Sequence, residues 1–313
     1  YLLSVETNQL TIKKKTIFEG VGLHSGLTTK IILLPSEINS GISFLRTDIK
    51  NSSPILANWK NIVSANLCTK IANSQGDSVS TIEHLMFSFY SLGITNLLVE
   101  INGPEIPIMD GSAKIFIDEI LKSGLLAQEQ KIKKIKILKT FEIRDHQKFI
   151  KFAPTKKDFL EIDYSLNYQD QFIKKQNFFL KNAQQNSLEV AHCRTFCHQE
   201  DLEKIFAMGL AKGGSLDNAI VISGNKVLNQ DGLRCKNEFV KHKILDCLGD
   251  LYLCGYSIAG KISCNQGGHE LTASLIKKIF ENKKNYLIEH AGVPANSKIT
   301  NKLANTSRIQ VVV

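Results

Sequence analysis

The sequence predicts an α+β fold: two domains of similar topology, each a sheet layered with helices, with a cleft between them. A chain of 313 residues exceeds the usual size of one hydrophobic core, so two domains are expected. Hydrophobic residues make up 43% of the chain, enough to build cores, and no apolar run reaches the ~18 residues of a membrane span. Strand-like and helix-like segments are mixed in both halves, which favours the α+β class.

Short strand-like segments separated by polar turns dominate the start of the chain. Residues 16–26 interrupt them with three glycines within seven residues, a composition that predicts a loop with close backbone approach. The strands of the first half are expected at 10–15, 29–34, 41–46, 55–70 and 96–101.

Two helices are expected in the first half. The first follows Ser80 or Thr81, either of which can cap it with Glu83 near the third helical position, and it ends at Gly93. Its apolar face consists of Leu85, Met86, Phe89 and Leu92. The second helix follows the turns at 103–107 and 109–112 and continues through Leu121.

A polar, basic stretch marks the expected domain boundary, which divides the chain into residues 1–128 and 129–313. Lysines interleaved at the start of the second half can form a nucleic-acid-binding stripe. A solvated strand face has the same pattern, however, and is the preferred interpretation. Strands are expected at 135–143, 149–154, 159–166, 172–179, 219–222 and 258–264, and helices at 201–209, at 237–250 and after His269.

The helix predicted at 237–250 has the clearest chemical pattern. His242, Asp246 and Asp250 lie four residues apart, so they form one stripe on its surface, about one turn between neighbours. An imidazole and a carboxylate one turn apart can both bind one Zn²⁺, with a third protein ligand from elsewhere. The same spacing also occurs on ordinary solvated helices.

A weak internal repeat suggests where the third ligand lies. His84 and Asp110 are 26 residues apart, and His242 and His269 are 27 apart, each pair enclosing a helix, a glycine and a strand. Two duplicated halves that meet face to face would place His84 beside His242. The result is a His, His, Asp set with an open coordination position, and Glu83 beside it can act as a general base. The alternative is a surface His84 beside a Glu83 that only caps the helix.

Two further residues extend this hypothesis. His269 follows a glycine-rich turn and, as a cation, can donate a proton to a leaving group. Asp250 can orient that imidazole and keep it charged, and Lys243 adds positive charge that can contact a phosphate.

The stretch 192–198 contains two histidines and two cysteines, a composition that resembles a soft-metal site. In a strand, residues 192, 194, 196 and 198 would lie on one face and the residues between them on the other. Four ligands therefore cannot converge without an irregular backbone, and no second metal is expected here.

The net charge indicates which partners the chain can bind, and the cysteine content indicates the compartment in which it works. The formal charge of +9 favours an anionic partner, which can be nucleic acid, a membrane surface or a phosphorylated substrate. The seven cysteines are odd in number and lie in apolar or helical patterns, as reduced thiols in a cytoplasm do. The first residues do not predict a signal peptide.

Several ordered motifs together resemble the UDP-3-O-acyl-N-acetylglucosamine deacetylases, a zinc-dependent family of lipid A synthesis. The resemblance covers nearly the whole chain, although Cys197 stands where a glycine is usual, and residues 192 and 193 also depart from the family pattern. The motifs are Gly-Val-Gly-Leu-His-Ser-Gly at 20–26, Ser-Thr-Ile-Glu-His-Leu at 80–85, Pro-Glu-Ile-Pro-Ile-Met-Asp-Gly-Ser at 104–112, Arg-Thr-Phe at 194–196, Gly-Gly-Ser at 213–215, His-Lys-Ile-Leu-Asp-Cys-Leu-Gly-Asp at 242–250 and Gly-His at 268–269.

The resemblance implies a role for each candidate residue. It implies that Glu83 is the general base, that His269 oriented by Asp250 is the general acid, and that Thr195 stabilises the oxyanion. The implied metal ligands are His84, His242 and Asp246, and the implied sugar and nucleotide contacts are Phe196 and Lys243. A βαβ-like insert around 195–222 would form the acyl-chain passage, lined by Leu202, Ala211, Leu216 and Ala219.

The resemblance also implies the reaction: hydrolysis of the 2-acetamido group of the UDP-sugar, as the committed step of lipid A biosynthesis in a Gram-negative bacterium. One catalytic Zn²⁺ is expected, and two imidazoles with one carboxylate also accept Fe²⁺. The chain is expected to be a cytoplasmic monomer that binds no nucleic acid and does not insert stably into a membrane. The alternatives are a metal-dependent hydrolase of another amide or ester, or a basic nucleic-acid-binding protein.

Overall fold

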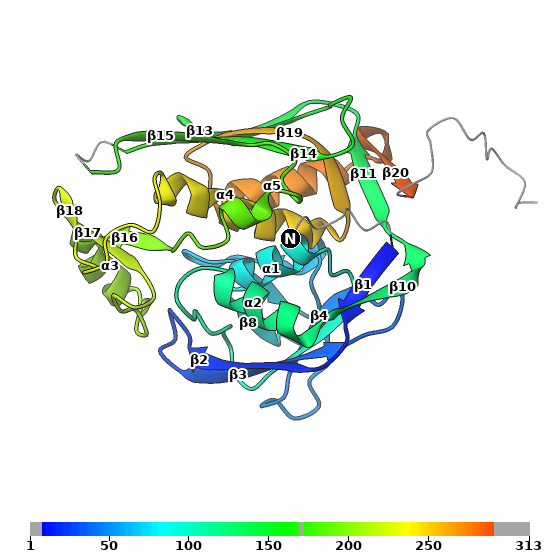
Figure 1. The fold of residues 1–313 in the computed structure, drawn as a ribbon, viewed down its shortest axis with the longest axis horizontal. Helices are drawn as coiled ribbons and strands as arrows, with labels where there is room; N and C mark the ends of the chain where they lie inside the picture. Colours follow the sequence, from blue (N-terminus) through cyan, green and yellow to red (C-terminus); the bar gives the residue numbers. More distant parts are fainter. Residues whose placement is uncertain (1–7, 169–171, 291–313) are drawn as a thin grey trace, which may run out of the picture.

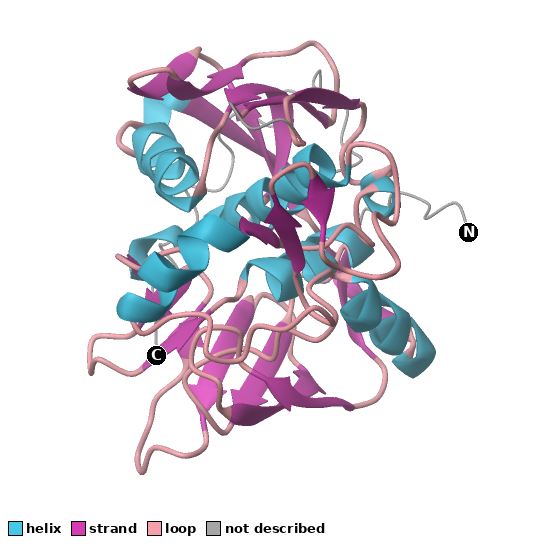
Figure 2. Cartoon of the chain, turned by 90° about the vertical axis from the view of Figure 1, so that its left-hand side faces the viewer, coloured by secondary structure: helices cyan, strands magenta, loops and turns pink. Residues whose placement is uncertain are grey.

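The computed structural model describes residues 8–168 and 172–290. Its central elements form four layers, in which two helix layers lie back to back between two sheets (Figure 1). Figure 2 shows the same order from the side, with the sheets outside and the helices between them. The helices are α1 (Glu83–Leu92), α2 (Lys114–Ser123), α3 (Leu202–Ala207), α4 (Glu238–Leu251) and α5 (His269–Phe280).

The first sheet has the strand order β2-β3-β9-β4-β5 and is antiparallel except where β4 runs parallel to β9. Its inner face is apolar, and Phe18 of this face packs edge-on against Phe116 of α2 at 5.0 Å. The strands are β2 (Thr16–Val21), β3 (Thr28–Pro35), β4 (Ile42–Arg46), β5 (Ile55–Leu56) and β9 (Leu97–Ile101).

The second sheet is built around β19, which pairs with β13 on one side and is parallel to β14 and β11 along different parts of its length. The other pairs, β12 with β13, β14 with β15 and β11 with β20, are antiparallel. The strands are β11 (Lys133–Ile137), β12 (Phe141–Asp145), β13 (Lys148–Ala153), β14 (Leu160–Asn167), β15 (Lys175–Leu180), β19 (Ser257–Asn265) and β20 (Tyr286–His290).

Three small sheets complete the fold. One of them contains a βαβ unit, in which β16 and β17 pair in parallel and α3 lies in the connection between them. The predicted domain division at residue 128 falls within β10, which pairs with β1, and it remains a prediction. The strands are β1 (Asn8–Ile12), β6 (Ile62–Val63), β7 (Lys70–Ala72), β8 (Ser78–Ser80), β10 (Leu125–Lys131), β16 (Phe196–His198), β17 (Ile220–Ser223) and β18 (Lys226–Val227).

The predicted α+β class is confirmed, but several local predictions are wrong. The segment 16–26 is not all loop, because β2 occupies its first half. The single strand predicted at 135–143 is two strands, β11 and β12. Within the described ranges, no helix combines the length and apolar character needed to cross a bilayer.

The predicted cap of α1 is also wrong. Ile82 is the N-cap residue, and no side chain caps the helix. The Thr81 hydroxyl instead donates to Glu105 at 2.8 Å, and the Glu83 carboxylate accepts from the backbone N–H of Thr69 at 3.1 Å. Glu83 is therefore free of the capping role that was its alternative interpretation.

A glycine on α4 brings the two central helices close together. A β-carbon added at Gly249 would lie 2.1 Å from the carbonyl oxygen of Glu83, so any larger residue would push α1 away. Because the contact lies at the start of α1, it sets Glu83 and His84 against the stripe of His242, Asp246 and Asp250 on α4. The close packing of two helices thus assembles the candidate site.

Candidate active site

The stripe predicted on α4 faces α1 and is buried there. His242, Asp246 and Asp250 are 2%, 5% and 3% exposed, and Glu83 and His84 at the start of α1 are each 4% exposed. Five polar side chains from two helices therefore meet away from bulk water. Burial of such groups requires compensation by hydrogen bonds, by paired charges or by a metal ion.

Three of these side chains form a group with metal-ligand spacing. Nε2 of His84 lies 3.4 Å from Oδ1 of Asp246, and Nε2 of His242 lies 3.3 Å from the same oxygen. A tetrahedral ion with ligand bonds of about 2.0–2.1 Å holds its ligand atoms about 3.3–3.4 Å apart. The predicted His84, His242 and Asp246 are therefore brought together at the spacing that one such ion needs.

The hydrogen bonds of His242 favour a cation at this point. Its Nδ1 lies 3.0 Å from the carbonyl oxygen of Cys193, which can only accept, so Nδ1 carries a proton. Burial lowers the pKa of His242 to about 4, which leaves the ring neutral with a lone pair on Nε2. That lone pair faces Oδ1 of Asp246, a buried atom with no hydrogen-bond partner among the described residues. A bound cation would satisfy both atoms.

The charge on Asp246 is stabilised by its neighbours. Burial alone would raise its pKa, but His242 and Lys243 hold the pKa of Asp246 well below its usual range. Nζ of Lys243 donates to Oδ2 of Asp246 at 2.7 Å, which leaves Oδ1 for a metal. Lys243, predicted to contact a phosphate, is thus paired with a candidate ligand in this structure.

Glu83 adjoins this group, because it precedes His84 at the start of α1. Burial raises its pKa, and the nearby His269 and His84 oppose that shift. One carboxylate oxygen accepts from the backbone of Thr69, and the other lies 3.9 Å from Nε2 of His269. A carboxylate with a raised pKa and one uncommitted oxygen is suited to accept a proton.

His269 begins α5 and pairs with Asp250, as the sequence predicted. Its Nδ1 lies 2.7 Å from Oδ2 of Asp250, and its Nε2 faces Glu83. Burial alone would lower its pKa, but the two carboxylates raise the pKa of His269 to about 9. The ring is therefore an imidazolium at neutral pH, able to donate from Nε2.

Thr69, just before β7, is a site residue that the sequence did not reveal. Its hydroxyl donates to Oδ1 of Asp250 at 2.6 Å and lies 3.1 Å from Nδ1 of His269, while its N–H binds Glu83. Thr69 therefore touches the proposed base, the proposed acid and the residue that orients the acid. It is 14 residues from Glu83, 181 from Asp250 and 200 from His269, and it belongs to no motif, so no local signal identified it.

The Arg-Thr-Phe motif at 194–196 is anchored beside the metal-type group. The Arg194 guanidinium pairs with the fully buried carboxylate of Glu238, at 2.9 Å for the shorter contact. The backbone N–H of Thr195 donates to the carbonyl of Gly111 at 2.9 Å. The ring of Phe196 packs 4.9 Å from that of Phe239 and 6.3 Å from that of His242. This motif therefore lies next to His242.

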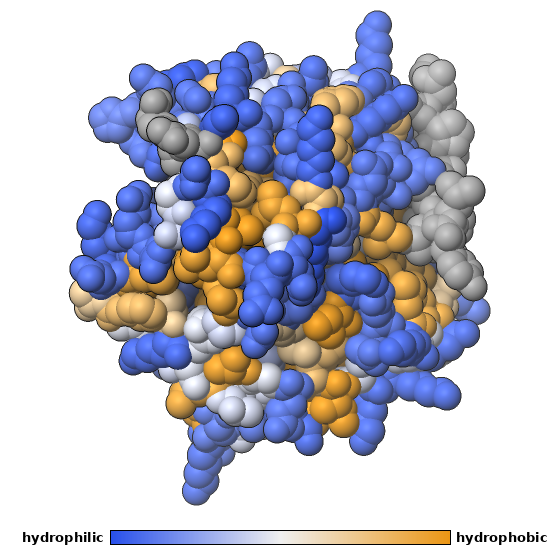
Figure 3. All heavy atoms as spheres, turned by 60° about the vertical axis from the view of Figure 1, so that its left-hand side comes forward, coloured by the Kyte–Doolittle hydropathy of each residue, from blue (hydrophilic) through white to orange (hydrophobic). Residues whose placement is uncertain are grey.

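The predicted acyl-chain residues differ widely in exposure. Leu202 and Ala211 are half-buried, Leu216 is 45% exposed, and Ala219 is buried. Apolar surface gathers on the face that Figure 3 brings forward, between hydrophilic margins. The exposed large apolar residues of the 195–222 segment are Phe206, Met208 and Leu216. The passage itself remains a prediction.

The glycine-rich loop of the first half supports this segment. The N–H groups of Lys212 and Gly213 donate to the carbonyls of His24 and Leu23, at 3.3 and 3.0 Å. A β-carbon at Gly213 would lie 2.3 Å from the carbonyl oxygen of Gly22, so the close backbone approach predicted for this loop is confirmed.

The stretch 192–198 is partly irregular, because residues 191–195 precede β16 and do not form a strand. The two histidines and two cysteines of this stretch nevertheless do not form one group: His198 packs against Tyr168 with ring centroids 5.7 Å apart. Cys193 instead faces Cys235, from the loop before α4, with 3.6 Å between the sulfur atoms. The sequence did not predict this pair.

Comparisons with known proteins agree with the sequence motifs. A family model described as LpxC, UDP-3-O-acyl N-acetylglycosamine deacetylase, matches residues 9–281. Proteins named UDP-3-O-acyl-N-acetylglucosamine deacetylase are similar along most of their length. One from Actinobacillus pleuropneumoniae serotype 3 is 40% identical over 278 residues, 88% of this chain and 90% of the relative. One from Campylobacter fetus is 40% identical over 279 residues, which are 89% of this chain and 93% of the relative.

Proposed function

The chain belongs to the family of UDP-3-O-acyl N-acetylglycosamine deacetylases, and from this premise we propose that it hydrolyses UDP-3-O-acyl-N-acetylglucosamine. The reaction cleaves the 2-acetamido bond with one water molecule, releases acetate and leaves a free amine on the sugar. It would be the committed step of lipid A biosynthesis. The observation that carries this assignment is the buried group of His84, His242 and Asp246 beside Glu83 and His269.

The buried group supplies the first step of the mechanism. His84, His242 and Asp246 would hold a Zn²⁺ ion, which would supply Lewis-acid polarisation of the amide carbonyl and of the attacking water. Glu83 takes the proton from that water as it attacks the amide carbon, and its raised pKa suits this role. The Thr69 N–H holds one oxygen of Glu83, so the other, which lies 3.9 Å from Nε2 of His269, is left to take the proton.

His269 acts in the second step. Its imidazolium donates the Nε2 proton to the departing amine nitrogen, and Asp250 keeps the ring charged and oriented through Nδ1. The Thr195 hydroxyl stabilises the oxyanion of the tetrahedral intermediate. Phe196 and Lys243 contact the sugar and nucleotide portions of the substrate.

The remaining assignments concern the surroundings of the site. Leu202, Ala211, Leu216 and Ala219 line a passage for the acyl chain, and the net charge of +9 suits the diphosphate. Zn²⁺ is the proposed ion, with Fe²⁺ as the alternative that the same donors accept. We further propose a cytoplasmic monomer whose anionic partner is this UDP-sugar rather than nucleic acid.

Acetate release from the acylated UDP-sugar tests the proposal. Purified protein should release acetate, lose this activity on chelation, and recover it with about one equivalent of Zn²⁺ per chain. The same sugar without its 3-O-acyl chain should react much more slowly. If well-folded, zinc-loaded protein releases no acetate, the proposed substrate is wrong. If activity survives complete metal removal, the proposed metal dependence is wrong.

The pairing of His269 with Asp250 predicts how the rate depends on pH. Because the pKa of His269 is raised to about 9, the donating form exists below that pH, and kcat/KM should fall as pH rises through about 9. In Asp250→Asn the carboxylate is lost and burial then lowers this pKa. The alkaline limb should move to lower pH by about one to three units. Profiles of wild type and variant, both zinc-loaded, measure the shift. An unmoved limb would exclude Asp250 from this role.

Thr69 is expected to position the acid and the base. A hydrogen bond to a charged group contributes about 1.5–3 kcal/mol, so Thr69→Val should lower kcat/KM by roughly ten- to hundredfold. Thr69→Ser keeps the hydroxyl and should stay near the wild-type rate. Metal content should be unchanged in both, because the described contacts of Thr69 include none of the three ligands. A fully active Thr69→Val would refute this positioning role.

A further inference from the structure

A second cluster of metal-ligating side chains lies outside the proposed catalytic group. One ring nitrogen of His192 and the sulfur atoms of Cys193 and Cys235 all lie within 4.8 Å of one another. The cluster combines a turn before β16 with the loop before α4, so residues 42 positions apart meet. The proposed deacetylation uses none of these three side chains.

The spacing of the two sulfur atoms fits a tetrahedral metal ion. Zinc–sulfur bonds of about 2.3 Å at a tetrahedral angle place two sulfurs about 3.8 Å apart. The observed Sγ–Sγ distance is 3.6 Å. A disulfide requires a sulfur separation of about 2.05 Å, so the thiols would have to move closer to form one. The arrangement therefore matches two metal ligands better than an incipient disulfide.

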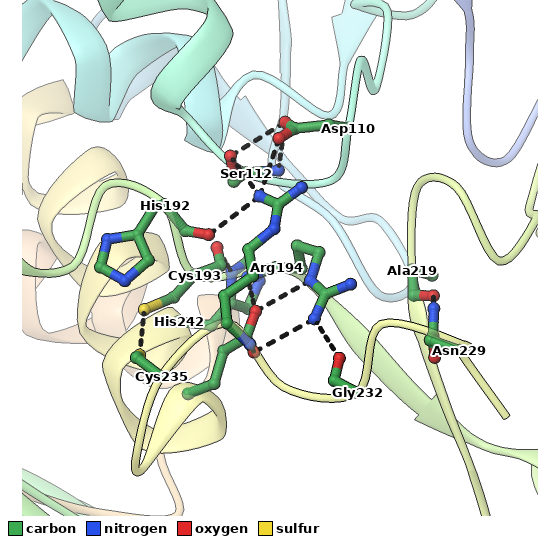
Figure 4. A network of polar contacts seen from close by, with 12 residues as sticks. Asp110, Ser112, His192, Cys193, Arg194, Ala219, Asn229, Gly232, Cys235 and His242 are labelled. Carbon is green, nitrogen blue, oxygen red and sulfur yellow. Dashed lines mark hydrogen bonds and ion pairs between the residues drawn. The ribbon is translucent and has the colours of Figure 1, made fainter. Parts of the chain in front are cut away.

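A network of ion pairs and hydrogen bonds, with the buried Arg194–Glu238 pair at its centre, holds both donor segments in place (Figure 4). Glu238 accepts from the guanidinium and backbone N–H of Arg194, and from the backbone N–H of Arg234 at 2.6 Å. The Arg234 guanidinium binds Asp110 at 2.8 Å and the carbonyl oxygen of His192 at 3.0 Å. Each cysteine thus neighbours an arginine fixed to the same carboxylate. Preorganised donors lose little freedom when they bind an ion.

A lysine lies beside one sulfur of the cluster, and two of its three donors are accessible from solvent. Nζ of Lys241 lies 3.9 Å from Sγ of Cys235. His192 and Cys235 are both partly exposed, so an ion can reach them from solvent.

We propose that His192, Cys193 and Cys235 form a second metal site that takes one thiophilic ion, such as Zn²⁺ or Cd²⁺, with a fourth position open to solvent. Two metal–sulfur bonds form as the two thiol protons pass to water. The site shares no ligand with the catalytic group. It is nonetheless adjacent to that group, because the carbonyl oxygen of Cys193 is the hydrogen-bond partner of His242.

Cadmium titration of the full-length chain, kept reduced by a phosphine, tests the proposal. The catalytic group contains no thiolate, so ultraviolet thiolate-to-cadmium charge-transfer absorption does not report cadmium bound there. Wild type should show this absorption, saturating at one ion per chain, with release of about two protons. Cys193→Ser and Cys235→Ser should each abolish it or weaken cadmium binding at least about tenfold. His84→Ala should retain it, which separates this site from the proposed catalytic group.

Cys197→Ser is the matched control, since Cys197 belongs to the same stretch but not to the cluster. This substitution should leave the absorption unchanged. Cys68→Ser should leave it unchanged as well, because Cys68 is a buried thiol near Glu83 and outside the cluster. Reduced wild-type protein without the absorption would overturn the proposal, whatever the variants do. Absorption of full intensity and affinity in Cys235→Ser would overturn it as well.

Discussion

Glu83→Ala should lower the rate of acetate release by roughly 10²- to 10⁴-fold, the usual contribution of a general acid or base, while one metal ion stays bound. The Glu83 carboxylate accepts from the backbone N–H of Thr69 and lies 3.9 Å from Nε2 of His269. None of its described contacts is with Oδ1 of Asp246. Its loss therefore removes the proton acceptor without removing a ligand. Steady-state kinetics and metal analysis on the same preparation measure both quantities.

Glu83→Gln separates the ability of the side chain to take a proton from its size and shape. The amide keeps an oxygen that can accept from the Thr69 N–H, but it cannot take a proton at neutral pH. The rate should fall nearly as far as in the alanine variant, with the fold and metal content retained. A near-normal rate in either variant would remove Glu83 from the mechanism, and loss of the ion would reassign it to metal binding.

Asp246→Ala should lose metal affinity by at least about a hundredfold, since even the loss of an outer-shell partner costs about 10–100-fold. The substitution removes the oxygen that both imidazoles face at 3.3 and 3.4 Å. It also leaves the Lys243 ammonium, 19% exposed, without its partner close to the site. Acetate release should therefore be negligible at one equivalent of Zn²⁺, and metal titration should show the weakened site.

Two controls separate ligation from electrostatics. Asp118→Ala removes an exposed carboxylate of α2 that pairs with Lys114, and it should change neither affinity nor rate. Lys243→Met removes the positive charge beside Asp246 but keeps the carboxylate, so the metal should remain bound. Unchanged zinc stoichiometry and affinity in Asp246→Ala would refute the proposed ligand role.

Local patterns predicted the helices well because a helix places its residues by sequence distance alone. The spacing of His242, Asp246 and Asp250 specified one stripe, and the structure has that stripe on α4. The strand at 96–101 was also close to the observed β9, because strand preferences act over a few residues.

Predictions that depended on partners distant in sequence were less reliable. Ser80, Thr81 and Glu83 have the spacing of a helix cap, but Thr81 and Glu83 bind Glu105 and Thr69 instead. The strand expected at 135–143 splits because β11 pairs with β20 while β12 pairs with β13. In each case a tertiary contact replaced the local one.

The sequence alone determined the fold class, the family and the set of side chains that could carry the chemistry, because residue types and helical spacing are local properties. Only the tertiary structure brought His84 to Asp246, through the close approach of α1 and α4 at Gly249. It likewise placed Thr69 on Asp250 and Cys235 on Cys193, pairs 181 and 42 residues apart. Such contacts arise from how helices and loops pack, and the sequence distance between residues that pack together follows no fixed spacing.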